Sequence, residues 1–125
     1  MSISERLDTM RGNIPGCSLV SFGDLTTGLA LRTSAGYAHK QDYLEDILQQ
    51  AALNFAVSDA LSAEGGSAGP QGHSVIVATP DEVRIFIRSE KCVSDVICCV
   101  CDDAQSVGQV AASAHQLFHD MVGGA

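Results

Sequence analysis

The sequence predicts a three-layer α/β/α domain with one five-stranded antiparallel sheet, in the element order α-ββ-α-βββ-α. Three observations support this fold class. One long helical segment, Gln41–Glu64, contains neither proline nor glycine. The strand-like segments around it have short connections, which join antiparallel neighbours because a parallel crossover takes a dozen or more residues. The later strands are apolar on both alternating faces, so helices should cover both faces of the sheet.

The first part of the chain is expected to form a short helix and a hairpin. Ser4 is expected to cap the helix, and Pro15 should end it. The apolar residues of this helix recur at near-helical spacing and are Ile3, Leu7, Met10 and Ile14. Two apolar strands, 17–22 and 29–33, then flank the turn-forming segment 23–28.

The long helix, Gln41–Glu64, carries apolar residues on two sides. One stripe occupies about a third of the circumference and is expected to cover the sheet; it consists of Leu44, Ile47, Leu48, Ala51 and Phe55. The second half adds an apolar set roughly opposite, which we expect to form a dimer interface: Leu53, Ala56, Val57, Ala60 and Leu61. A chain this small has little else to cover that side, so a second copy or a partner protein is the simplest supplier.

The second part of the chain is expected to form three strands and a final helix. A Gly-rich loop, 64–72, leads into strands at 73–79, 83–88 and 95–101. Asp102 or Asp103 is expected to cap the last helix. Its core stripe recurs at helical spacing up to Gly123 and comprises Val107, Val110, Ala111, Ala114, Leu117, Phe118 and Met121.

Composition excludes several classes of function. Residues 1–125 are expected to form a single domain, because a chain of 125 residues buries roughly two-thirds of its unfolded surface. A net charge of −8 with only 7 Lys and Arg residues argues against nucleic acid and an anionic membrane surface as binding partners.

No apolar run approaches the ~18 residues of a membrane span, and the first residues lack the pattern of a signal peptide. We therefore expect a cytoplasmic protein without membrane insertion.

The cysteines are expected to be structural. There are five, an odd number bunched late in the chain, which is typical of reduced core residues. A strand turns Cys98 to one face and Cys99 and Cys101 to the other, whereas structural zinc ligands usually come as pairs that wrap a turn. The sequence assigns no partner to Cys17 or Cys92. We therefore expect neither a metal nor a cofactor.

No catalytic residue is indicated elsewhere. His115 and His119 have the spacing of a zinc protease pair, but Gln116 stands where that mechanism needs a glutamate. We expect both histidines to be solvated. The segment 65–70 lacks the Lys-Ser/Thr ending of a phosphate-binding loop and follows a helix rather than a strand. The chain is therefore not expected to be an enzyme.

The arginines give no sign of a residue that enters another protein's active site. They lie on the first helix and on separate strands and are Arg6, Arg11, Arg32, Arg84 and Arg88. Even spacing turns Arg84 and Arg88 to the face of their strand that carries Phe86. If a helix covers that face, we expect at least one of the two head groups to reach solvent at its rim.

Four short motifs stand in a characteristic order along the chain. They are Ile14-Pro15-Gly16-Cys17 before the first strand, Asp24 and Gly28 in the first turn, Ser94-Asp95-Val96-Ile97 opening the last strand, and Ser106-Val107-Gly108 at the last helix. With the element order, they resemble the roadblock/dynein light chain family, including its bacterial members, over essentially the whole chain. The resemblance implies a roadblock/profilin-like fold, a dimer built on the long helix and the middle strand, and partnership with small GTPases or motor and scaffold complexes.

Two classes of function follow. The first is a non-catalytic dimeric adaptor or regulator that binds a small GTPase or a signalling or motor scaffold. The second is a small-ligand-binding protein or a thiol- or metal-dependent enzyme whose site is assembled from scattered residues. The excess apolar surface of the long helix favours the first class, because the polar residues all have ordinary structural explanations.

Overall fold

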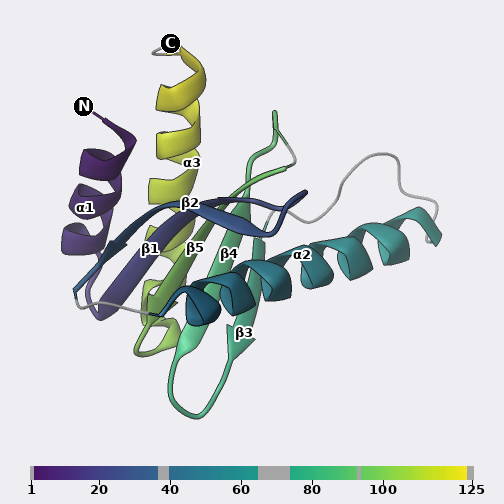
Figure 1. Cartoon of the computed structure of the whole chain (residues 1–125), viewed down its shortest axis with the longest axis horizontal. Coiled ribbons are helices and arrows are strands. Elements are labelled where there is room, and N and C mark those ends of the chain that lie inside the picture. The colour runs from purple at the N-terminus through teal and green to yellow at the C-terminus, as the bar shows by residue number, and fades with distance from the viewer. Residues whose placement is uncertain (1, 37–39, 65–73, 93, 124–125) are drawn as a thin grey trace.

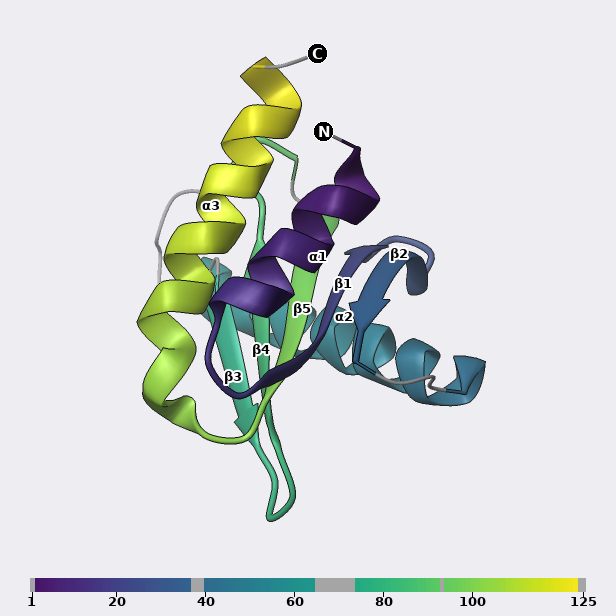
Figure 2. The same ribbon diagram turned by 90° about the vertical axis from the view of Figure 1, so that its left-hand side faces the viewer.

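The protein is one layered α/β/α unit, as the computed structural model shows for residues 2–36, 40–64, 74–92 and 94–123. Helices α1 and α3 lie side by side on one face of the sheet, and α2 crosses the other face (Figures 1 and 2). The element bounds are α1 Ile3–Asn13, β1 Cys17–Asp24, β2 Leu29–Ala35, α2 Gln41–Glu64, β3 Ser74–Ala78, β4 Val83–Arg88, β5 Asp95–Cys101 and α3 Val107–Gly123. The predicted fold class and element order are confirmed.

The sheet brings the two ends of the sequence together. Its strand order is β2-β1-β5-β4-β3, and every neighbouring pair is antiparallel. Strands β1 and β5, which are far apart in the sequence, therefore pair directly beside the centre of the sheet. Strands β2 and β3 form its two edges. Sequence proximity identifies the β1–β2, β3–β4 and β4–β5 pairs but not the β1–β5 pair.

Each face of the sheet carries its own hydrophobic core, because β4 and β5 are apolar on both sides. Ile85, Ile87 and Ile97 join the core under α1 and α3, whereas Phe86 and Val96 join the core under α2. The α2 stripe packs as predicted. Ile47, Leu48, Ala51 and Phe55 are fully buried, and Leu44 is partly buried against them. The expected coverage of both faces is therefore confirmed.

Two predicted helix starts need correction. The N-cap of α1 is Ser2 rather than Ser4, since the Ser2 hydroxyl accepts a hydrogen bond from the Glu5 backbone N–H at 3.2 Å. Asp103 is a cap, but it caps a short 3₁₀ turn, Ala104–Ser106, that precedes α3. A 3₁₀ helix is wound more tightly than an α-helix. This short turn therefore leads from the end of β5 at Cys101 to the start of α3 at Val107 within a few residues.

The first hairpin is longer than predicted, because β1 extends to Asp24 and β2 to Ala35. The Asp24 carboxylate accepts hydrogen bonds from the Thr26 backbone N–H and the Thr27 hydroxyl, and Gly28 closes the turn at a φ of +71°. A positive φ favours glycine, which explains Gly28. The loop was predicted at 64–72, but Glu64 is the last residue of α2, and the rest of that loop and its neighbour His73 lie outside the described residues.

In the described part of the chain, no helix has both the length and the apolar character needed to cross a membrane.

Candidate protein–protein interface

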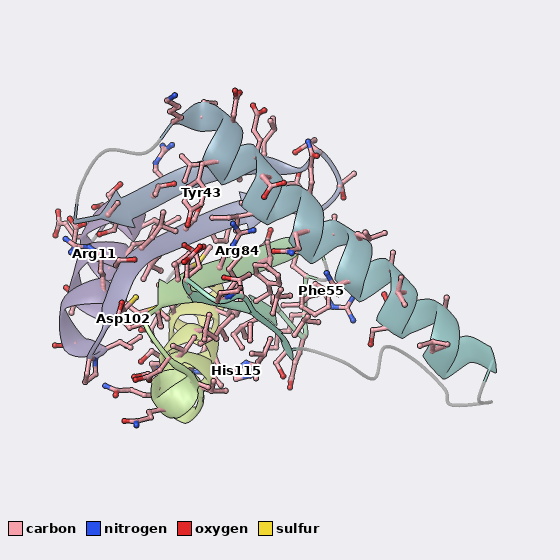
Figure 3. All side chains as sticks on the ribbon, turned by 90° about the horizontal axis from the view of Figure 1, so that it is seen from below. Arg11, Tyr43, Phe55, Arg84, Asp102 and His115 are labelled. Carbon is pink, nitrogen blue, oxygen red and sulfur yellow. The ribbon has the colours of Figure 1, made fainter. Side chains whose placement is uncertain are left out.

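Helix α2 is longer than the sheet beneath it. Its first half lies across the strands, but past Phe55 it projects beyond the sheet (Figure 3). Phe55 is also the last residue of α2 in the hydrophobic core on that face. The part of the helix beyond Phe55 therefore has no sheet to bury its apolar side chains.

The predicted interface residues run from just before Phe55 onto the overhanging part of α2 and are exposed in the single chain. Leu53 is 66%, Val57 50% and Leu61 63% exposed, and Ala56 and Ala60 are exposed beside them. Spacing of four residues places the three large side chains along one side of the helix. Large apolar side chains gathered in this way are typical of a surface that binds another protein.

Two arginines of β4 hold α2 against the sheet. Arg88 makes two hydrogen bonds of 2.8 Å to the Asp59 carboxylate, and its guanidinium lies 4.6 Å from the centre of the Phe55 ring. Four residues earlier on the strand, Arg84 binds Asp46 and Gln50 of α2 at 3.2 and 2.9 Å. These contacts fix how α2 is rotated and so keep the apolar row of its second half pointing outward.

The expectation that Arg84 or Arg88 reaches solvent is wrong. The Arg88 side chain is only 3% exposed and that of Arg84 13%. The reason is that Asp59 of α2 pairs with Arg88, and Asp46 of α2 together with Glu82 pairs with Arg84, so carboxylates take the place of water around both charges. The shared face with Phe86 was predicted correctly, since Phe86 packs in the core under α2.

The edge strand β3 offers a second element of the candidate interface. The Thr79 N–H donates to the Glu82 carbonyl at 2.9 Å, which makes residues 79 and 82 a hydrogen-bonded pair. Such pairs alternate along an antiparallel ladder, so Ile76, opposite Ile85, belongs to a non-hydrogen-bonded pair. Its backbone N–H and C=O point away from β4 toward the open edge. Ile76 is 49% exposed. The sequence did not indicate this exposure, because the strand is apolar on both of its alternating faces.

The described residues also form surface hollows, one of which adjoins the candidate interface. One of about 240 Å³ adjoins α2 and is lined by Leu25, Thr26, Ala52, Phe55, Ala56, Asp59, Arg88 and Ser94. One of about 340 Å³ runs between α1 and α3 and is lined by Arg6, Thr9, Met10, Asn13, Ala112, Ser113, Gln116, Leu117 and Asp120. The third, about 250 Å³, includes His115 and His119, which are exposed as predicted. Within the described ranges, no group of three His, Cys, Asp or Glu residues could hold a metal ion.

The pairing of β1 with β5 gives Cys17 the partners that sequence could not assign. Cys17 lies opposite Cys101, and both contact the core under α1 and α3 together with Cys99, whereas Cys98 faces α2. Hydrogen bonds with the Cys101 and Cys99 thiols lower the pKa of Cys17, and the same contacts raise the pKa of both partners. Burial raises the pKa of Cys98.

Layer order, strand order and a long overhanging helix together define a roadblock/profilin-like domain. No protein-family model matches the sequence, and no curated protein sequence does. Solved structures do match the fold. A Roadblock/LC7 domain from Streptomyces avermitilis has a TM-score of 0.80 at 8% identity, over 98% of this chain and 97% of that one.

Two further structures support the same classification. MglB from Myxococcus xanthus has a TM-score of 0.74 at 12% identity, covering 97% of this chain and 92% of its own. A profilin from Schizosaccharomyces pombe has a TM-score of 0.60 at 16% identity and 98% coverage of both chains. The chain therefore folds as a roadblock-type domain, as the sequence resemblance predicted.

Proposed function

We propose that this protein is a non-catalytic adaptor or regulator that acts as a homodimer. The observation that carries the proposal is the exposed row of Leu53, Val57 and Leu61 along one side of the second half of α2. Leaving such side chains in water forgoes about 1.5–3 kcal/mol each relative to burial. A second copy presents the same row, and an isologous contact between two such helices covers both at once.

The partner we propose is a small GTPase or a signalling or motor scaffold, which is what the roadblock resemblance implies. The structural neighbours fit this direction, since they include MglB and MglC from Myxococcus xanthus, and one MglB structure has a tetrameric arrangement. The net charge of −8 adds a physical preference, because it favours a partner with a basic surface.

Any effect on GTP hydrolysis is expected to come from the dimer surface rather than from a catalytic arginine. Stimulation by an arginine finger needs a cation presented to the transition-state charge. Arg84 and Arg88 are held by α2, and Arg6 pairs with Asp120 at 2.8 Å. Arg11 donates to the Ser34 hydroxyl, and Arg32 lies on β2 rather than on a loop.

A pair of charged substitutions tests the interface. Val57→Glu with Leu61→Glu should convert the dimer to monomers, because two carboxylates would have to lose their water in an apolar contact. Size-exclusion chromatography with light scattering measures the mass. The matched control is Leu29→Glu with Leu31→Glu, since these leucines are 46% and 45% exposed but lie on β2, at the opposite edge of the sheet from β3.

The same two variants test the adaptor role. Immobilised wild-type protein and the β2 control should capture a cognate small GTPase, whereas the α2 double variant should capture at least ten-fold less. A dimeric mass for the α2 variant would remove this helix from the interface. Equal capture by the monomer would show that partner binding does not need the dimer.

A further inference from the structure

The strands β1 and β5 place two cysteines in the geometry of a disulfide. Cys17 and Cys101 are direct partners in the ladder. The Asp102 N–H donates to the Gly16 carbonyl at 3.0 Å, and the Cys17 N–H is turned to the Ile14 carbonyl at 3.2 Å. Residues 16 and 102 are thus the hydrogen-bonded pair, and Cys17 and Cys101 the adjacent non-hydrogen-bonded pair. Such pairs have Cα atoms about 4.5 Å apart, inside the roughly 4.4–6.8 Å that a disulfide spans.

Cys99 shares the same face but is not the ladder partner of Cys17. It is opposite Val20, and the register shifts between Cys17 and Leu19, so β1 carries two residues between Cys17 and Val20 where β5 carries one between Cys101 and Cys99. The direct pairing therefore favours Cys101 over Cys99 as the sulfur that bonds to Cys17, while both thiols contact Cys17.

The surroundings favour Cys17 as the reactive member of the pair. Cys17 is partly exposed, whereas Cys99 and Cys101 are buried. The thiols of Cys101 and Cys99 lower the pKa of Cys17, and the positive charge of Arg11 adds to the effect. A thiolate that peroxide can reach, beside a second thiol, is the arrangement that oxidation by peroxide exploits.

We propose that Cys17 is a hydroperoxide-sensitive modification site and that Cys101 closes a disulfide with it, linking β1 to β5. The Cys17 thiolate attacks the peroxide, so that an S–O bond forms, the O–O bond breaks and hydroxide leaves. The Cys101 thiol then attacks the sulfenic sulfur. The S–S bond forms, the S–O bond breaks, and the departing hydroxide takes the Cys101 proton as water. Two thiols and one hydrogen peroxide give one disulfide and two waters.

The disulfide lies where α1 leads into β1 and β5 leads into α3. Here the Ser106 hydroxyl donates to the Pro15 carbonyl at 3.0 Å, and the Gln109 amide donates to the Asn13 carbonyl at 2.7 Å. The new bond would tie together the two segments that position α1 against α3. A dithiol reductant should reverse it.

The first test uses the reduced wild-type chain and a small excess of hydrogen peroxide. The count of free thiols in denaturant should fall from five to three, since one disulfide consumes two thiols. Trypsin should then release peptide 12–32, which contains Cys17, linked to peptide 92–125. Recovery of peptide 12–32 unlinked and with a free thiol would overturn the proposal.

Single variants identify the partner. Cys17→Ser and Cys101→Ser should both abolish the link, whereas Cys99→Ala and the exposed-site control Cys92→Ser should retain it. In Cys101→Ser the sulfenic acid lacks its direct ladder partner, so dimedone should label Cys17. A link that survives Cys101→Ser, or the absence of a dimedone adduct there, would contradict the assignment. The readout is thiol chemistry and does not depend on dimerisation.

Discussion

At the scale of single residues, Arg88 shows how a buried charge can fix a helix on a sheet. Its stem lies in the sheet face shared with Phe86, and its guanidinium meets the Asp59 carboxylate with two hydrogen bonds of 2.8 Å. The Phe55 ring covers the guanidinium at 4.6 Å. A planar fork that bonds a carboxylate through two nitrogens and also stacks on an aromatic ring is specific to arginine, so lysine cannot replace it.

Replacing Arg88 with alanine should therefore destabilise the fold by about 1–3 kcal/mol, the usual cost of losing hydrogen bonds to a charged group. The lower part of this range is expected because the Asp59 side chain is 43% exposed and stays hydrated when its partner is removed. Urea unfolding followed by circular dichroism measures the change. The control is Arg32→Ala on the exposed edge strand β2, which should stay within about 0.5 kcal/mol of wild type. Equal effects at both sites would deny Arg88 this anchoring role.

At the scale of elements, β3 and the second half of α2 are the parts that the single chain leaves uncovered. The strand lies at the sheet edge with the backbone groups of Ile76 directed outward, and the helix overhangs the sheet. Open edges and apolar helix faces both promote association between chains. A dimer that adds one β3 edge to another while the helices pack would cover both features together.

Ile76→Pro tests whether the strand takes part. Proline removes an N–H that β4 does not use, so each chain should still fold, as it does for prolines on edge strands generally. The dimer dissociation constant should rise at least about ten-fold, equivalent to about 1.4 kcal/mol. Sedimentation equilibrium measures it. Ile76→Thr keeps the N–H and serves as the control; a dimer unaffected by proline would leave the helix as the sole interface.

At the scale of the whole molecule, the acidic charge opposes the proposed association. Each copy carries a net charge of −8, so two copies repel each other as they approach. The proposed interface, by contrast, is built from apolar side chains whose attraction does not depend on charge. Ionic strength should therefore separate the two effects.

Raising the salt concentration from about 0.05 to 0.5 M should tighten the homodimer, because screening shortens the range of the repulsion to a few ångströms. Sedimentation equilibrium across the series gives the dissociation constant at each salt concentration. Sodium chloride is the suitable salt, since sulfate would also strengthen apolar contacts directly. Dissociation at high salt would instead indicate an interface dominated by ion pairs.

The sequence by itself determined the elements, the layers and the faces. Apolar residues that recur every 3.6 or 2 positions show which side of a helix or strand is buried. The sequence therefore predicted the buried stripe of α2 that ends at Phe55 and the strands that are apolar on both faces. Short connections were enough to make neighbouring strands antiparallel. The same patterns placed Cys98 and Cys99 on opposite faces of the sheet. They also placed the row of Leu53, Val57 and Leu61 on the side of α2 that faces away from the sheet.

Only the tertiary structure decided what lies across each face. No local pattern pairs β1 with β5, so the partnership of Cys17 with Cys101 depended on a contact between segments 84 residues apart. The buried heads of Arg84 and Arg88 depended on where the carboxylates of α2 come to rest. The open edge at Ile76 depended on which strands end the sheet. In each case the deciding quantity is a distance between segments remote in sequence, and chain periodicity carries no information about that distance.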